Sequence, residues 1–186
     1  MIVLPEIVVS PRLTLRRWLP VDAPLLGAAV VANTEHLRPW MPWIADEPMS
    51  DDDRRDLVVG WEAHWHSGGD VIFGAFLADV VVGGCGLHRR AGPESLEIGY
   101  WVHVHHLRRG YATEIARELT NVALSVPGIA RVEIHHDAAN LASRGVPESL
   151  GFRLDGETPD EPTAPGEVGI DVAWSTTIDD WQGVST

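Results

Sequence analysis

Residues 97–114 read EIGYWVHVHHLRRGYATE, and this stretch decides the fold. Its first part is rich in β-branched and aromatic residues, which is typical of a strand that ends near Val104. A helical pattern then begins at Gly110 and ends before Pro127. A short loop with two arginines therefore joins the end of a strand to the beginning of a helix.

The turn between this strand and this helix has the properties of an anion site. The first turn of a helix carries unpaired N–H groups and a partial positive charge. Gly110 lets a ligand approach the backbone closely, and Arg108 and Arg109 can bind phosphate oxygens. Ala112 is small enough to leave room for a pyrophosphate. A plain strand-to-helix connection that contains a glycine is the alternative, and the GxGxxG pattern is absent.

The remaining patterns predict an α+β fold. Strands are expected at residues 12–18, 71–77, 80–88, 95–104, 131–136, after Phe152 and at 168–176. Helices are expected at residues 22–33, 50–66, 110–124 and 140–150. An antiparallel meander that leads into a βαβ unit predicts a mixed, mostly antiparallel twisted sheet of about seven strands flanked by helices.

Two details of this prediction can be checked directly. The helix at 50–66 has Leu57, Trp61 and Trp65 at a spacing of four residues, which predicts that these three form its buried stripe. The polar, Pro-rich residues 155–167 are expected to form a loop.

Length and charge limit the class of protein. The chain has 186 residues, which predicts one domain over residues 1–186. It carries 14 basic and 27 acidic residues, for a net charge of −13. A negative field repels nucleic acid and anionic membranes, so neither is an expected partner, and it attracts cationic substrates such as amines. Solubility alone is the alternative reason for the charge.

Other features of the sequence predict a cytoplasmic location. Cys85 is the one cysteine, so the chain can form no internal disulfide, which suits a reducing compartment. Residues 1–10 are apolar but lack the basic start of a signal peptide. No apolar run reaches the 18 or so residues that a membrane span needs.

Two segments together resemble the GCN5-related N-acetyltransferase (GNAT) superfamily. LRRGYA at residues 107–112 is similar to its phosphate-binding consensus, Gln/Arg-x-x-Gly-x-Gly/Ala, with Leu107 as a departure at the first position. NLASRGVPESLGF at 140–152 is similar to a later family motif. LTLR at 13–16 and WMPW at 40–43 resemble the ribosomal-protein N-terminal acetyltransferase (RimJ/RimL-like) branch. The matches span about residues 12 to 176.

The resemblance implies a GNAT fold in which two neighbouring strands splay apart to hold acetyl-CoA as co-substrate. Backbone groups near Val102 and Val104 would bind the pantetheine arm. The pyrophosphate would lie on Arg108 and on the backbone amides of Arg109, Gly110, Tyr111, Ala112 and Thr113. Asn140 would bind the pantetheine or position the thioester.

The implied activity is acetyl transfer to a primary amine by direct attack, on either a protein N-terminus or a small molecule. Glu97 is the first candidate for the general base, and Ser143 is the candidate that protonates the leaving thiolate. Glu97 could instead pair with an arginine or face water, and Ser143 could bond only to the helix backbone. A neutral histidine is another candidate base. A non-catalytic acyl-CoA-binding module is the alternative function.

The histidines and tryptophans allow further interpretations. His103, His105 and His106 with residues 135–136 could bind a metal, but no recognisable ligand spacing completes the set, so no metal is expected. Cys85 is expected to be a small buried hydrophobe. The tryptophans between residues 40 and 65 are expected in the core, at a homodimer contact or over the acceptor site.

Overall fold

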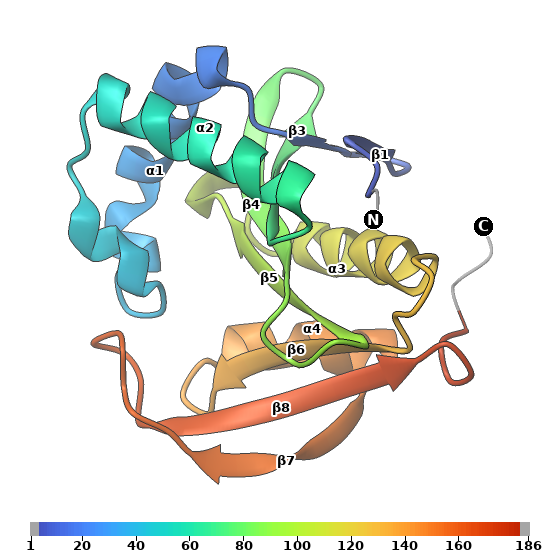
Figure 1. Ribbon diagram of the computed structural model, residues 1–186. Helices are drawn as coiled ribbons and strands as arrows, with labels where there is room; N and C mark the ends of the chain where they lie inside the picture. Colours follow the sequence, from blue (N-terminus) through green and yellow to red (C-terminus); the bar gives the residue numbers. More distant parts are fainter. Residues whose placement is uncertain (1–3, 183–186) are drawn as a thin grey trace.

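A computed structural model describes residues 4–182, and in this part eight strands form one sheet in the order β1-β2-β3-β4-β5-β6-β8-β7 (Figure 1). The strands are β1 Ile7–Val9, β2 Thr14–Arg17, β3 Val71–Leu77, β4 Val80–His88, β5 Ser95–Val102, β6 Arg131–Asp137, β7 Arg153–Pro159 and β8 Ile170–Thr177. The α-helices are α1 Ala23–Leu37, α2 Asp51–Ser67, α3 Tyr111–Leu124 and α4 Leu141–Leu150. Short 3-10 turns lie at Pro20–Asp22, Pro42–Asp46 and Val104–His106.

The one parallel strand pair in this sheet is short. β5 and β6 pair only at Ser95–Glu97 against Arg131–Glu133. Beyond Glu97, β5 stays with β4 as far as Val102, while β6 stays with β8 as far as Asp137. The two strands therefore diverge, and a gap opens between their C-terminal halves (Figure 1).

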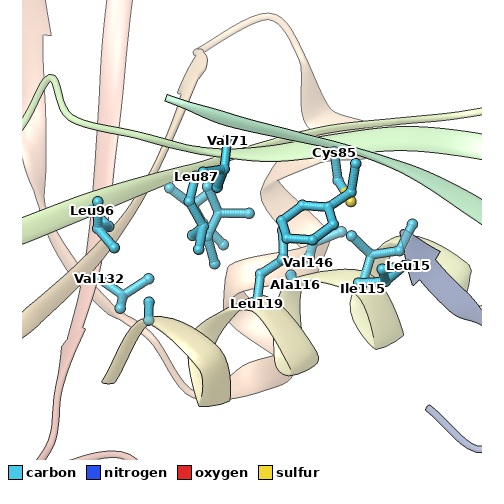
Figure 2. Close-up of a cluster of buried hydrophobic side chains, with 14 of the residues drawn as sticks. Leu15, Val71, Cys85, Leu87, Leu96, Ile115, Ala116, Leu119, Val132 and Val146 are labelled. Atoms are coloured by element: carbon cyan, nitrogen blue, oxygen red, sulfur yellow. The ribbon is translucent and has the colours of Figure 1, made fainter. Parts of the chain in front are cut away.

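The helices lie in two layers. One group of buried side chains joins α1 and α2 to one face of the sheet through Trp18, Val30, Val58 and Phe76. A second group joins α3 and α4 to the opposite face. The amphipathic face of α3 supplies the centre of this second group, because Ile115, Ala116 and Leu119 recur at helical spacing and are fully buried. Figure 2 shows them against strand residues from β2 to β6.

Several predicted elements are confirmed. The helix predicted at 50–66 is α2, whose Ser50 side chain accepts a hydrogen bond from the Asp53 N–H at 3.2 Å. It ends at Gly68, which has the left-handed φ of 80° that favours glycine. The predicted strands at 71–77 and 80–88 are β3 and β4 with the same bounds. Cys85 is buried among the apolar side chains of Figure 2, as expected.

Other details of the prediction are wrong. In α2 the buried residues are Arg54, Val58 and Trp65, whereas Leu57 is exposed and Trp61 only partly buried. Leu57 and Trp61 instead line a cavity on the same side of the sheet. Of the predicted stripe, Trp65 therefore lies in the core, whereas Leu57 and Trp61 face a cleft.

The strand ends also differ from the prediction. The polar segment predicted as a loop at 155–167 begins within β7, which pairs with β8 at the edge of the sheet. β7 is the strand predicted after Phe152, and its polar sequence hides how far it extends, because an edge strand with two exposed faces needs no apolar alternation. β1 extends the sheet to eight strands, and β5 ends at Val102 rather than Val104.

The core of α3 allows a stability test. Replacing fully buried Leu119 with alanine leaves a cavity, and we expect Leu119→Ala to lower the free energy of unfolding by about 2–5 kcal/mol. Leu141, with 70% of its surface exposed, is the matched control, and Leu141→Ala should change it by less than about 0.5 kcal/mol. Urea unfolding of both variants would measure the difference, and equal effects would contradict the assignment of α3 to the core.

Candidate active site

A cavity of about 900 Å³ lies where β5 and β6 diverge. Its walls come from β4, β5 and β6, from the Trp-rich segment after α1, and from the loop between β7 and β8. The last two meet, because the Gly166 N–H donates to the Pro39 carbonyl at 2.9 Å. A side chain at Gly166 would clash with Pro39, so this contact requires glycine. The Trp-rich segment and the β7–β8 loop therefore bound the cleft from the two sides of the gap.

A buried ion pair fixes the Trp-rich wall of the cleft. Arg54 of α2 donates to both carboxylate oxygens of Glu47 at 2.7 Å, and both side chains are almost completely buried. Glu47 follows the turn that contains Trp43. Removal of either partner would leave an unpaired buried charge, so the pair fixes where this wall lies.

The turn before α3 presents backbone donors at the other end of the gap. Arg108 and Gly110 have positive φ angles of 57° and 77°, which reverse the chain between β5 and the helix. The first intrahelical bond runs from the Glu114 N–H to the Gly110 carbonyl at 3.0 Å. The N–H groups of Tyr111, Ala112 and Thr113 have no acceptor among residues 4–182. These three N–H groups are therefore available to an anion, and the anion cradle expected from the sequence stays a prediction.

Gly110 has a conformational role that the structure shows directly. A Cβ there would lie 3.5 Å from Arg12 Nη2, which is ordinary contact, so space alone does not require glycine. Glycine is needed because of the left-handed backbone conformation.

Glu114 holds the first turn of α3 against the β1–β2 hairpin. Its carboxylate accepts from the Ser10 hydroxyl at 2.6 Å and from the Arg12 Nε at 2.6 Å, and Arg12 Nη1 also donates to the Arg109 carbonyl at 2.8 Å. Burial alone would raise the pKa of Glu114, but the bonds from Ser10 and Arg12 outweigh it and lower the pKa. Glu114 therefore stays ionised, and its negative charge is paired with Arg12 within the protein.

The strand before the cradle offers one of the two predicted backbone sites. The His103 N–H donates to the Val82 carbonyl at 2.8 Å, so alternation turns the backbone groups of Val102 away from β4 and into the gap. Val104 lies in a 3-10 turn, and its N–H donates to the buried side chain of Asn33 at 2.6 Å. The expectation that Val104 offers a strand-like site is therefore wrong.

Asn140 and Ser143 lie at the far wall of the gap, at the start of α4. The Asn140 side chain caps the helix by accepting from the Ser143 N–H at 3.1 Å. The Tyr100 hydroxyl, from β5, lies 3.0 Å from Ser143 Oγ and donates to the Ser143 carbonyl at 3.2 Å. Burial raises the pKa of Tyr100 to about 12, so this phenol stays protonated as a donor.

Pro147 explains why the Ser143 carbonyl needs this donor. Pro147 lies inside α4 and has no N–H for the carbonyl four residues before it. Tyr100 therefore replaces a missing helix bond and holds Ser143 at the gap. No local sequence pattern predicts this role of Tyr100, because the reason for it lies in a proline 47 positions away in the sequence.

Glu97 faces the cleft from β5, next to Arg90 at 3.4 Å. Opposite it, on β6, His135 lies between the carboxylates of Glu133 and Asp171, each at 2.9 Å. Burial opposes the charged form of His135, but the two carboxylates outweigh it and raise its pKa. His135 is thus held as an imidazolium and is a poor candidate for a base.

The other histidines divide into two groups. His136 and His88 line the cleft with His135. His136 uses both ring nitrogens, on the Asp137 carbonyl at 2.8 Å and on Trp174 Nε1 at 3.1 Å. His103 and His106 lie in the turn after β5, outside the cleft, and burial lowers the pKa of each. Among the described residues no three His, Cys, Asp or Glu side chains converge on a metal site, and no helix could span a membrane.

Comparisons with known proteins agree on one family. Residues 12–153 match the model of the acetyltransferase (GNAT) domain. YdaF of Bacillus subtilis (strain 168), provisionally named a ribosomal N-acetyltransferase, is 27% identical over 94% of this chain and 96% of its own. A crystal structure of a probable acetyltransferase is 26% identical with a TM-score of 0.85, covering 94% of this chain and 98% of that one. The ribosomal alpha-N-protein acetyltransferase RimL, solved with coenzyme A, shares the fold at 22% identity and a TM-score of 0.81 over 97% of this chain and 99% of that one.

The contact between Tyr100 and Ser143 predicts coupling with Pro147. Tyr100→Phe leaves the Ser143 carbonyl without its donor, and we expect a loss of about 1–2 kcal/mol in the free energy of unfolding. Pro147→Ala supplies the N–H that reaches this carbonyl in a helix. It should therefore stabilise the Tyr100→Phe variant more than it stabilises the parent. Denaturant unfolding of the four proteins would measure this, and strictly additive effects would contradict the contact.

Proposed function

The chain belongs to the acetyltransferase (GNAT) domain family, and from this premise we propose that it transfers the acetyl group of acetyl-CoA to the N-terminal amine of a ribosomal protein. One observation carries the proposal: the gap between β5 and β6 has a row of unpaired backbone amides at one end and the cleft beside it. Such a gap suits a long, flexible thioester with an anionic head.

The residues around the gap fit acetyl-CoA as co-substrate. The amides of Tyr111, Ala112 and Thr113 would hold the pyrophosphate, with the exposed side chains of Arg108 and Arg109 beside them. The pantetheine arm would run along the backbone of Val102 in the manner of an added strand. The side-chain amide of Asn140, whose oxygen already caps α4, would donate its N–H to that arm. Leu107, the departure from the consensus, is exposed and takes no part in this arrangement.

The chemistry needs three groups. The amine nitrogen attacks the thioester carbonyl, a carbon–nitrogen bond forms, and the carbon–sulfur bond breaks. The N–H of Val102, which faces the gap, would stabilise the oxyanion. The Ser143 hydroxyl would give its proton to the thiolate, with Tyr100 holding the serine in place. A base in the cleft must take a proton from the ammonium, and Glu97 is the candidate that the sequence predicts.

The charge and shape of the cleft support an amine acceptor. Asp46, Asp160 and Glu161 line it and make no ion pair with any residue in the described range. Trp40, Trp43, Trp61 and Trp101 also line the cleft, and aromatic faces attract an ammonium group. The net charge of −13 acts in the same direction at longer range. An acceptor whose N-terminal segment is cationic would have a suitable charge.

Two alternatives differ in what they predict. A small-molecule acceptor would use the same cleft and the same co-substrate. A non-catalytic acyl-CoA-binding module would keep the cradle without any turnover.

An enzyme acting on ribosomal proteins would work in the cytoplasm. The homodimer expected from the sequence stays a prediction.

The cradle can be tested by adding a charge to it. Ala112→Asp places a carboxylate beside the unpaired amides, where it suits the helix start but repels a pyrophosphate. We expect the affinity for acetyl-CoA to fall at least tenfold, or about 1.4 kcal/mol, by isothermal titration calorimetry. Ala63→Asp on the exposed side of α2 carries the same charge and should bind acetyl-CoA like the parent. Equal affinities for all three proteins would remove the cradle from the site.

The activity can be tested by thiol release from acetyl-CoA. The acceptors are peptides that differ only in their N-terminal residue, with small amines in parallel. Ser143→Ala should lower kcat about 10²-fold with little change in KM for acetyl-CoA, because the thiolate loses its proton donor. Ser149→Ala, in the same helix, is the control and should keep kcat. If the parent binds acetyl-CoA but releases no thiol with any acceptor, the non-catalytic alternative holds.

A further inference from the structure

His88 and Asp70 form a pair at the edge of the cleft that the sequence analysis did not predict. His88 ends β4, and Asp70 lies directly before β3. The His88 Nδ1 lies 2.7 Å from Asp70 Oδ2, and the other carboxylate oxygen of Asp70 accepts from the Arg89 N–H at 2.9 Å. Burial would raise the pKa of Asp70, but these bonds outweigh it and lower the pKa. The ionised carboxylate therefore holds the proton on Nδ1 and leaves Nε2 as the acceptor nitrogen.

The free nitrogen Nε2 lies over two glycines. Gly86 and Gly99 are register partners in β4 and β5, as are His88 and Glu97. A Cβ on Gly99 would lie 3.0 Å from Nε2, and one on Gly86 3.2 Å from it. The ring is therefore tilted along the strands towards the gap, and Nε2 lies above Gly99. Gly99 is two residues closer to Val102 along β5 than Glu97 is. Either glycine, replaced by a larger residue, would displace this ring.

Nε2 is open to the cleft. The His88 side chain is 14% exposed and lines the cavity. Nε2 makes no hydrogen bond with any side chain or backbone group among residues 4–182. Of the three cleft histidines, His135 is held protonated by two carboxylates and His136 uses both nitrogens within the fold. His88 therefore has the one imidazole nitrogen in the described cleft that can accept a proton.

The charges around His88 suit a base that gains a proton. Asp70 lies on Nδ1, Glu97 is its cross-strand partner, and Arg90 approaches Nδ1 at 3.4 Å. Two carboxylates thus face one guanidinium, which stabilises an imidazolium once it forms. Glu97 in turn pairs with Arg90 at 3.4 Å. A carboxylate is ordinarily a weaker base than an imidazole.

On the basis of the proposed acetyl transfer, we propose that His88 is the general base, oriented by Asp70, and that Glu97 helps to bind the acceptor. The ammonium of the acceptor gives one proton to Nε2 and becomes the attacking amine. The nitrogen loses its second proton as the tetrahedral intermediate collapses and the carbon–sulfur bond breaks; the thiolate gains a proton from Ser143, and the proton from the nitrogen passes through water in the cleft to restore the Ser143 hydroxyl. The imidazolium then releases its proton to water through the cleft, so one proton leaves per turnover.

The test compares His88→Gln, Asp70→Asn and Glu97→Gln across a range of pH, with acetyl-CoA and the best peptide of the N-terminal panel. In the parent, kcat/KM should fall as acid protonates the imidazole. His88→Gln should lose about 10²-fold in kcat at neutral pH, without this acid limb and with KM for acetyl-CoA unchanged. Its rate should approach that of the parent at high pH, where the acceptor amine is itself neutral. Asp70→Asn should show a smaller loss and a displaced acid limb, since asparagine cannot stabilise the imidazolium.

Glu97→Gln separates the two candidate bases. It should raise KM for the peptide and keep the acid limb. The proposal is overturned if His88→Gln keeps the parent kcat and acid limb, or if Glu97→Gln removes that limb. Calorimetric binding of acetyl-CoA shows that each variant is folded, and if His88→Gln does not bind, the Asp70→Asn profile decides. A parent that binds acetyl-CoA but releases no thiol refutes the proposed function itself, and this inference with it.

Discussion

The arrangement of the site depends on the early end of the β5–β6 pairing. Three residue pairs, from Ser95 to Glu97, join these parallel strands, and each strand then follows its other neighbour. A sheet that stayed paired would have no opening between its faces, because neighbouring strands lie only about 4.8 Å apart. The divergence exposes the backbone edge of Val102 and brings Tyr100 within reach of α4. The cleft and the cradle become parts of one site because the gap lies between them.

Polar contacts between distant segments fix what surrounds this gap. Asn33 of α1 holds the turn after β5, Glu114 of α3 holds the β1–β2 hairpin, and Arg54 of α2 holds the Trp-rich wall. In each of these contacts at least one partner is a buried polar side chain, and its hydrogen bond allows one arrangement of the two segments. Buried ion pairs add little net stability when compared with apolar packing, so their effect here is on position. The apolar groups on the two faces of the sheet supply the stability instead.

Local patterns predicted much of this arrangement, and tertiary pairs account for most of what they missed. α2 with its Ser50 cap, the β3–β4 hairpin and the turn at Gly110 follow from neighbouring residues. The strand expected after Phe152 is β7, but its extent into the polar segment was missed because an edge strand needs no apolar alternation. Leu57 and Trp61 were placed in the core because a helix that faces a cleft has the same spacing as one that faces a core. No local pattern connects Asp70 with His88, or Tyr100 with Pro147, because the fold alone brings them together.

The central claim is that acetyl-CoA binds in the gap between β5 and β6. Backbone amide NMR during a titration with acetyl-CoA measures, residue by residue, where it binds. The account predicts that the amide signals of Tyr111, Ala112 and Thr113 shift most, together with that of Val102, because these N–H groups gain acceptors. The signal of Ala63, on the exposed side of α2, should stay near its starting position. Saturable binding that leaves Tyr111–Thr113 and Val102 unshifted would contradict the claim that the gap between β5 and β6 is the acetyl-CoA site.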